Sequence, residues 1–324
     1  MKSNFQILAN GKDITRKIAD RLLSLTVVDE AGMNSDTVAI SIDDRDSSIE
    51  FPRTGAKLEV TLGYEEDKLK KTGVYTVDEV SMSWPPQSMS INGKAANMLE
   101  GIKATKTRPW DNITIGDLVN KIAGEHSLIA KVGDDLASMT IEHLDQTSES
   151  DLHLLTRLAT QYDAISKPVA GKWLFVKRAQ GKSVSGKELP VVSLKPKDVT
   201  SWNVTISGRA KYGSVTADWH DNLEATREIV KVGEGKPIFN LTQSFPNEAQ
   251  AKTAAKAALA RLKRGTGSLE ITVQGNAALM VEGVLVLKGF REGVDGRWSI
   301  NRVIHTINNK GFITTAFGES EGIK

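Results

Sequence analysis

The sequence of 324 residues contains no cysteine. Disulfide bonds, thiolate metal ligands and cysteine nucleophiles are therefore excluded together. An excess of charge is also lacking, because 42 Lys and Arg residues are balanced by 40 Asp and Glu residues and the net charge is +2. This balance argues neither for nor against a nucleic-acid partner. No run of basic residues stands out beyond Arg261–Arg264.

Long hydrophobic runs are missing as well. No stretch approaches the roughly 18 continuous apolar residues of a membrane-spanning helix, so we expect no membrane insertion. The first residues, MKSNFQILANGKD, lack the apolar core of a signal peptide. We therefore expect the protein to be made, and first to fold, in a cytoplasm. The length is sufficient for two or three domains, each with its own core.

Motifs for metal or phosphate binding are absent or incomplete. None of the histidines has the spacing of metal ligands, and we interpret each as structural or exposed. They are His126, His143, His153, His220 and His305. Gly181-Lys182-Ser183 resembles the end of a phosphate-binding loop, but Val176 stands where the loop needs its first glycine. Since the backbone cannot form the anion cradle without that glycine, we interpret this segment as a polar turn.

Catalytic residues are equally hard to find. Asp43, Asp44 and Asp46 follow a predicted strand and could bind calcium, but their spacing is not that of an EF-hand loop. A solvated turn is the better interpretation. No G-x-S-x-G elbow occurs, so a serine-hydrolase arrangement has no anchor. The sequence therefore predicts no catalytic, cofactor-binding or metal-binding residues, and we expect a protein that is not an enzyme.

One pattern occurs twice, in Gly55–Val80 and again in Gly283–Val303. Each copy has an alternating strand, a Gly-aromatic pair, a polar turn and then the frame Gly-x-aromatic-x-aliphatic-x-x-Val. The frame residues are Gly73, Tyr75, Val77 and Val80 in the first copy, and Gly296, Trp298, Ile300 and Val303 in the second. Any two antiparallel hairpins could look alike, but copies this far apart suggest a duplicated β module. Tyr75 and Trp298 are then expected at equivalent inward positions.

Strand patterns occupy both ends of the chain. Residues 1–97 read as a meander of short strands that forms a small β-barrel or sandwich, interrupted at Trp84-Pro85-Pro86. Pro190 to Lys197 reads as a linker, and residues 196–324 read as a second β-barrel module. Its first strands are expected at Val204 and Ile206, and then at Val215 and Ala217. Polar alternate positions, such as Ser24 and Thr26, predict that one face of the sheet meets water or another subunit.

Helical patterns appear in the middle and near the end of the chain. Residues 98–195 read as a mixed α/β region with two helices, the first capped at Thr114 and the second between Ser148 and Asp151. A helical insertion at about 246–264 interrupts the second β module, and Gly265 ends it. Its alanine-rich stripe suits close packing on a sheet, and its basic side chains are interpreted as a solvated face. The predicted fold class is therefore α+β, mainly β, with two duplicated barrels joined by an α/β region.

Several segments, in this order, resemble the phage late control gene D family of contractile-tail hub proteins. In the first β region they are Ser35-Asp36-Thr37, Ile40–Asp46, Pro52–Gly55, Leu62-Gly63-Tyr64, Val77–Val80, Pro85-Pro86 and Ile91–Ala95. In the middle, Glu149–Ala159 is similar to a helix shared with the valine-glycine-repeat spike proteins of type VI secretion. Phe245-Pro246-Asn247-Glu248-Ala249 and the Ala-rich helix are also typical of the family.

The resemblance implies a tail-hub-like fold and a structural role. It implies a homotrimeric baseplate hub that adapts a sixfold tail tube to a threefold central spike. The expected partners are the tail spike protein and the tail tube protein, with the tape-measure protein as an additional candidate. The expected location is the tail baseplate of the virion, and the host bacterial cytoplasm during assembly. The glycine-repeat needle of the secretion spikes is absent, and no helix-turn-helix pattern indicates specific nucleic-acid binding.

Two other functions stay open at this point. The first is a cell-wall-acting enzyme at the tail tip, which a pair of carboxylates in a cleft would favour. The second is a cell-wall-binding or nucleic-acid-binding module built around the helix expected in Thr114–Leu128. Plain core packing is the better interpretation of that helix.

Overall fold

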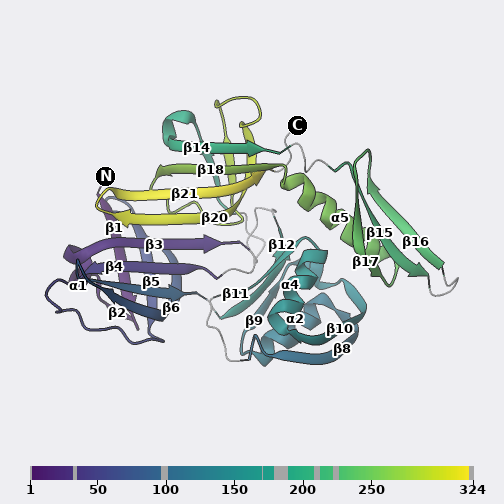
Figure 1. The fold of residues 1–324 in the computed structure, drawn as a ribbon, viewed down its shortest axis with the longest axis horizontal. Helices are drawn as coiled ribbons and strands as arrows, with labels where there is room; N and C mark the ends of the chain where they lie inside the picture. The colour runs from purple at the N-terminus through teal and green to yellow at the C-terminus, as the bar shows by residue number, and fades with distance from the viewer. Residues whose placement is uncertain are drawn as a thin grey trace.

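The computed structural model describes residues 2–31, 35–95, 101–169, 171–178, 189–207, 212–221 and 226–320. It consists of one large β-sheet and two smaller α/β units (Figure 1). The middle unit contains β8 to β12, and the outer unit contains β15 to β17 with α5. No helix in the described ranges is both long enough and apolar enough to span a membrane.

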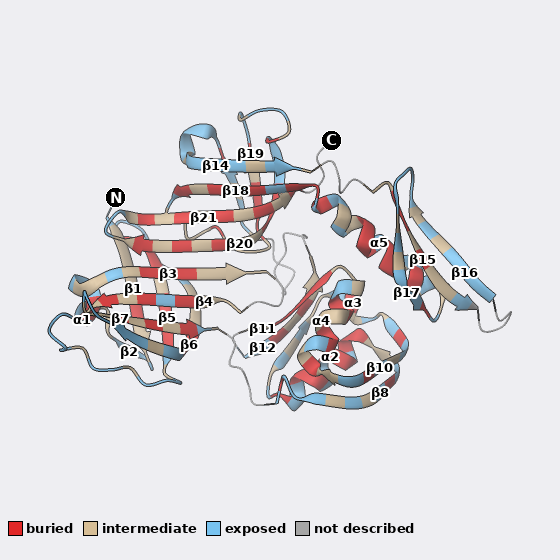
Figure 2. Ribbon diagram, viewed as in Figure 1, coloured by how far each residue is buried: buried red, intermediate tan, exposed pale blue. Residues whose placement is uncertain are grey.

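The large sheet has 13 strands and draws on both ends of the chain. Its strands are β1 (Ser3–Ala9), β2 (Lys12–Asp13), β3 (Leu22–Glu30), β4 (Thr37–Asp43), β5 (Lys57–Tyr64), β6 (Lys70–Ser83), β7 (Ser88–Lys94), β13 (Val191–Leu194), β14 (Val199–Ile206), β18 (Gly267–Gln274), β19 (Val284–Leu287), β20 (Gly296–Asn308) and β21 (Gly311–Ser320). Buried and less buried residues alternate along β18 and β21, as Figure 2 shows. One face of the sheet therefore carries the core, as the alternating pattern requires.

The strand order of the first β region repeats in the second. The first module is ordered β3-β4-β7-β6-β5-β1, and the second is ordered β14-β18-β21-β20-β19-β13. Both orders are the same when β2, which pairs only with β1, is left out and the other six strands of each module are numbered along the chain. One strand differs in direction, since β1 runs antiparallel to β5 whereas β13 runs parallel to β19. Apart from this strand and β2, the two modules share one topology.

The two frames lie on equivalent strands, β6 and β20. Tyr75 and Trp298 are 1% and 2% exposed, so the predicted inward position of both rings is confirmed. The ladder shifts register between Val77 and Glu79 in β6, and between Ile300 and Arg302 in β20. A bulge adds one residue to its strand, so two apolar residues three positions apart can face the same side. This explains the x-x spacing before the final Val of both frames.

The modules join through β3 and β20. Residues Arg302 to Asn308 of β20 pair antiparallel with residues Glu30 to Ser24 of β3. The first core, which contains Leu25, Val60 and Tyr75, also includes Ile307 and Phe312 from the second module. Neither module closes into a hydrogen-bonded barrel among the described strands, and the two share one continuous sheet instead. The mainly β fold is as expected, while the barrels are not confirmed.

The middle unit is itself built from two similar halves. Its elements are β8 (Thr105–Thr114), α2 (Ile115–Glu125), β9 (Ile129–Val132), α3 (Asp134–Ala137), β10 (Thr140–Ser150), α4 (Asp151–Gln161), β11 (Ala164–Val169) and β12 (Lys172–Lys177). Helix α4 begins and ends 36 residues after α2. Thr114 Oγ1 accepts from the Asp117 N–H, and Ser150 Oγ accepts from the His153 N–H, so both predicted caps are confirmed.

The outer unit corrects the expected second β module. It consists of β15 (Ser214–Asp221), β16 (Thr226–Gly233), β17 (Ile238–Phe245) and α5 (Glu248–Arg264). Val215 and Ala217 lie in this separate three-stranded sheet, and their core partners are alanines of α5 rather than residues of the large sheet. The helix ends at Gly265 as predicted. The whole segment between β14 and β18, and not the helix alone, is therefore an insertion.

The expected linker at Pro190 to Lys197 also needs correction. It contains β13, which pairs with β19 in the large sheet. The segment is therefore part of the second module and not only a connection. The division of the chain into residues 1–97, 98–195 and 196–324 stays a proposal, although β13 lies before its last boundary and pairs within the second module.

Candidate functional site

The sequence motifs considered for chemistry do not come together. Gly181-Lys182-Ser183 lies outside the described residues. In the acidic cluster, Arg45 pairs with Asp43, the Ile49 N–H donates to Asp44, and Arg21 pairs with Asp46. These contacts support a turn rather than a calcium loop. Within the described ranges, no group of three or more His, Asp and Glu side chains is placed to hold a metal ion.

The histidines have separate surroundings. His305 is 3% exposed, and its Nδ1 lies 2.9 Å from the hydroxyl of Thr314. Burial lowers the pKa of His305 to about 4, so this residue is a neutral part of the core at pH 7. His143 and His153 are exposed and lie beside carboxylates. His126 belongs to the polar network described next.

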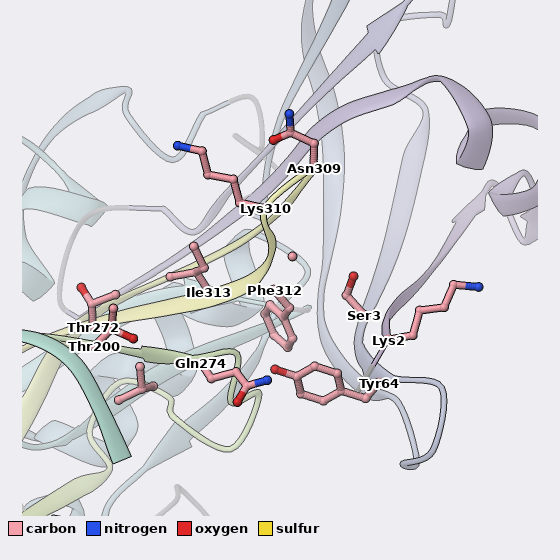
Figure 3. A pocket seen from close by; sticks show the side chains of 12 residues that line it. Lys2, Ser3, Tyr64, Thr200, Thr272, Gln274, Asn309, Lys310, Phe312 and Ile313 are labelled. Carbon is pink, nitrogen blue, oxygen red and sulfur yellow. The ribbon is translucent and has the colours of Figure 1, made fainter. Parts of the chain in front are cut away.

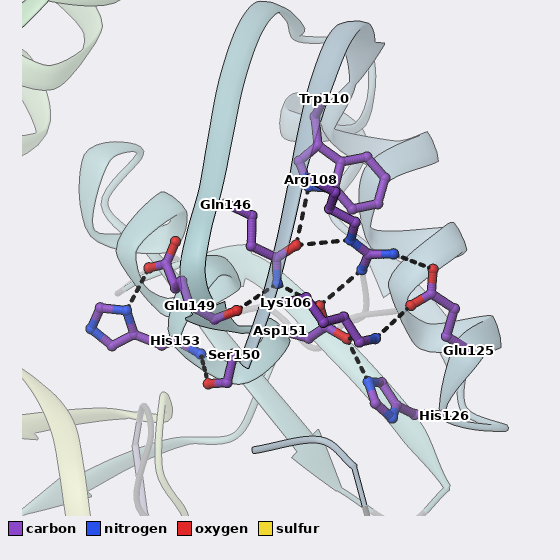
Figure 4. A network of polar contacts seen from close by, with 10 residues as sticks. All are labelled: Lys106, Arg108, Trp110, Glu125, His126, Gln146, Glu149, Ser150, Asp151 and His153. Carbon is purple, nitrogen blue, oxygen red and sulfur yellow. Dashed lines mark hydrogen bonds and ion pairs between the residues drawn. The ribbon is translucent and has the colours of Figure 1, made fainter. Parts of the chain in front are cut away.

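The main polar network of the middle unit surrounds Asp151, which is fully buried (Figure 4). Lys106 and Arg108 on β8 pair with it at 2.6 and 2.9 Å, and His126 lies 2.8 Å away. The Gln146 amide also donates to it at 2.8 Å. Burial alone would raise the pKa of Asp151, but these hydrogen bonds hold it below its ordinary value. Asp151 is therefore an ionised anchor that holds α4 against β8, because all its contacts stabilise the charged form.

Residues in equivalent positions of the two halves meet in this network. Trp110 and Gln146 are 36 residues apart, and the indole N–H donates to the Gln146 carbonyl at 3.3 Å. Pro109 pairs with Asp145, which is also 36 residues away, in the β8–β10 ribbon. The ribbon is therefore arranged symmetrically about this pair. Arg108 stacks on the Trp110 ring at 4.3 Å and covers the centre of the ribbon.

A second polar cluster joins the two β modules to the middle unit. Lys167 of β11 donates to the Glu30 carbonyl at 2.6 Å and to Asp36 at 2.5 Å. Asp29 accepts from the Val281 N–H at 3.1 Å. Burial and the neighbouring Asp36 carboxylate raise the pKa of Asp29 to about 7. Asp29 and Asp36 are thus neighbouring carboxylates, and both are engaged in contacts between units.

The seam between the two β modules contains a pocket of about 480 Å³ (Figure 3). Strands β1, β5, β14, β18 and β21 supply its lining. The Tyr64 and Phe312 rings lie 5.6 Å apart and form its apolar part. Lys2, Thr272 and Lys310 line its polar part. Polar and apolar groups therefore contribute to the pocket in similar measure.

The fold is shared with solved tail proteins. Two structures with a similar fold are the 43 kDa tail protein of prophage MuSo2 from Shewanella oneidensis (TM-score 0.73, 14% identity, covering 98% of each chain) and the tail protein of Neisseria meningitidis MC58 (TM-score 0.74, 12% identity, covering 100% of this chain and 98% of that one). The Escherichia coli c3393 protein, a type VI secretion component, is similar over 98% of this chain and 76% of its own, with a TM-score of 0.55 and 12% identity.

Sequence relatives give the family. The chain is 31% identical to the "Probable baseplate hub protein" of Escherichia phage 186, over 96% of this chain and 91% of the relative. It is 30% identical to the protein of the same description in Escherichia phage P2, over 96% and 92%. The family model for the phage tail baseplate hub (GPD) matches residues 94–311. The chain therefore belongs to the phage tail baseplate hub family, and the resemblance identified from its sequence is confirmed.

Proposed function

We propose that the chain acts in the baseplate as a homotrimeric, non-enzymatic hub that adapts a sixfold tail tube to a threefold spike. The observation that carries this proposal is the strand order shared by the two β modules. Three chains with two similar modules each supply six similar units around one axis. Cyclic assembly of this kind needs a heterologous contact, in which one module of a copy meets the other module of the next.

The polar face of the large sheet supports a surface that lines a channel or contacts a partner. Thr26 and Thr306 meet across the junction of the modules, with their hydroxyls 3.5 Å apart. Thr272 and Thr315 meet in the same way at 3.1 Å in the second module. Uncharged hydroxyls tolerate water and other polar chains equally well. The proposed partners are the spike protein, the tube protein and the tape-measure protein.

The proposed location is the tail baseplate of the virion, after folding in the host cytoplasm. Mass spectrometry and electron microscopy of purified tails test this proposal. The expected result is three copies per tail, at the end of the tube, with both modules in one ring. Six copies per tail, or a ring built from only one of the two modules, would contradict it.

The absence of enzymatic activity is part of the same proposal. It is supported by the contacts of Asp29 and Asp36, whose carboxylates hold units together. A peptidoglycan-clearing assay with the purified chain should show no activity above buffer. Clearing that disappears in an Asp29→Asn or Asp36→Asn variant would favour the cell-wall enzyme instead.

A further inference from the structure

The junction inside the chain shows how one module binds another. Before its bulge, β20 pairs along one edge with β19. Past the bulge, the same edge of β20 pairs with β3. The strand equivalent to β20 in the first module is β6, and the strand equivalent to β3 in the second module is β14. The match holds in detail, because β3 has a register shift between Leu22 and Ser24, and β14 has one between Val199 and Ser201.

Strands β6 and β14 both lack the neighbour that β20 and β3 find in each other. Past its bulge, β6 pairs with β7 on one edge, and no described strand occupies the other. Strand β14 pairs with β18 alone among the described strands. The two edges belong to strands that are far apart in the strand order of the sheet, and they do not pair with each other within the chain. Each copy therefore carries both halves of a second such contact, and both are unpaired among the described strands.

Four of the exposed apolar side chains lie at these two edges. Met82 and Trp84 of the β6 end are 57% and 77% exposed, and Trp202 and Ile206 of β14 are 42% and 46% exposed. The residues at the positions equivalent to Met82, Trp84 and Trp202 are buried at the internal junction. They are His305 (3%), Ile307 (4%) and Leu25 (0%). The same positions are thus buried at the internal junction and exposed at the two unpaired edges.

Two other edge strands, β1 and β16, are protected, and β14 is not. The Ile7 N–H at the outer edge of β1 donates to Thr15, and the Phe5 N–H donates to Asn4. Edge strand β16 carries Arg227, Glu228 and Lys231. Charge and capping are the usual defences of an edge strand. The sequence of β14, VTSWNVTI, has no charge, proline or glycine, which suits a strand that another chain covers.

We propose that β14 of one copy pairs antiparallel with residues 79–84 of the next copy, as β3 pairs with β20. The register of the internal junction places Met82 opposite Val204, Ser83 opposite Asn203 and Trp84 opposite Trp202. The apolar side chains then share one face and extend the core of the second module. This inference rests on the proposed trimeric hub, since three such contacts close a ring of six modules.

Cysteine cross-linking tests the register, because the wild-type chain has no cysteine. Thr26 and Thr306, whose hydroxyls lie 3.5 Å apart, are the internal equivalents of Asn203 and Ser83. A chain with Ser83→Cys and Asn203→Cys should form covalent dimers and trimers on oxidation. A chain with Thr26→Cys and Thr306→Cys should close within one copy. A chain with Glu79→Cys and Asn203→Cys, four residues out of register, should form no cross-link.

A second pair of variants tests the apolar contact without altering the fold. Met82→Lys places a charge where the contact buries its side chain, so trimer association should weaken at least about tenfold. Ile229→Lys is the matched control, because Ile229 is 67% exposed on the outer unit. Both variants should melt like the wild type as single chains. Light scattering measures the association, and it should be unchanged for Ile229→Lys.

The outcomes separate this pairing from the proposed function. A trimer that forms without the Ser83–Asn203 cross-link overturns the pairing and leaves the trimeric hub in place. A chain that stays monomeric and uncross-linked at every concentration also overturns the pairing. Absence of the chain from purified tails contradicts the proposed function itself.

Discussion

Gly93 and Gly318 occupy the same position beneath the bulges of the two β modules. A Cβ added to Gly93 would lie 3.0 Å from the Thr76 carbonyl oxygen, and one added to Gly318 would lie 3.1 Å from the Ser299 carbonyl oxygen. Both carbonyls follow the inward aromatic residue of the frame. The close approach of two strands at each bulge therefore requires a residue without a side chain.

Replacing either glycine should destabilise its module. Gly318→Ala is expected to lower the free energy of unfolding by about 1–3 kcal/mol, because a backbone oxygen cannot move aside easily. Gly124→Ala is the matched control, since Gly124 lies in α2 with no atom within 4 Å of the added Cβ. It should stabilise the chain by about 0.5–1 kcal/mol. Equal urea midpoints for the two variants would contradict the close approach.

The aromatic residue of the frame is the second target. Trp298→Ala should cost about 3–5 kcal/mol of stability, because the ring is 2% exposed and its N–H donates to the Val294 carbonyl. Thermal unfolding measures the loss. Ile129→Ala, at a side chain that is 63% exposed, should stay within about 0.5 kcal/mol of the wild type. A Trp298→Ala chain that melts with this control would place the indole outside the core.

Asp29 should make stability depend on pH. Its pKa is about 7 in the folded chain against an ordinary value of 3.8, so the folded state holds the proton more tightly than the unfolded state. The contribution of Asp29 to stability is therefore highest below about pH 4 and is lost as the pH rises to about 7. Asp29→Asn should be more stable than the wild type at pH 8 and similar to it at pH 4.

His305 acts in the opposite sense over the same range, since its folded pKa is lowered to about 4 and its stability contribution is lost as the pH falls. The informative quantity is thus the difference between Asp29→Asn and wild type at each pH, because His305 is common to both. A difference that does not change between pH 4 and pH 8 would show that Asp29 ionises normally.

The buried carboxylate of the middle unit gives the fourth prediction. Asp151→Ala leaves Lys106 and Arg108 without their buried partner, so we expect a loss of about 3 kcal/mol. Asp145→Ala is the matched control on the same ribbon, because the Asp145 side chain is 65% exposed and its pairing with His143 is worth little. Urea unfolding of the two variants should differ clearly. Similar midpoints would mean that solvent can replace Asp151 as the partner of Lys106 and Arg108.

Local patterns predicted local structure well. The frame residues Tyr75 and Trp298, the caps at Thr114 and Ser150 and the helix end at Gly265 were all readable, because each depends on neighbours in the chain. The 36-residue repeat of the middle unit also left a signal that was missed. Equivalent positions in α2 and α4 carry similar apolar residues, and the pairs are Leu118 and Leu154, Val119 and Leu155, Ile122 and Leu158, and Ala123 and Ala159.

Pairing between distant segments could not be predicted in this way. Nothing near Val215 tells whether its strand joins the large sheet or a separate one, because both environments bury one face of an alternating strand. The contact of Lys167 with Asp36 is equally invisible, since 131 residues separate them. The β3–β20 junction joins the two ends of the chain, and only the strand order of the whole sheet reveals it.

The connection from β3 to β4 and the connection from β14 to β18 occupy the same place in the two modules. Six residues separate β3 from β4, whereas 60 residues separate β14 from β18. The larger of these segments contains the whole outer unit, yet the strand order on either side is the same. The connection between β14 and β18 is therefore a natural site of domain insertion. The outer unit is an accessory that a related hub could lose, exchange or enlarge while keeping the strands that join one module to another.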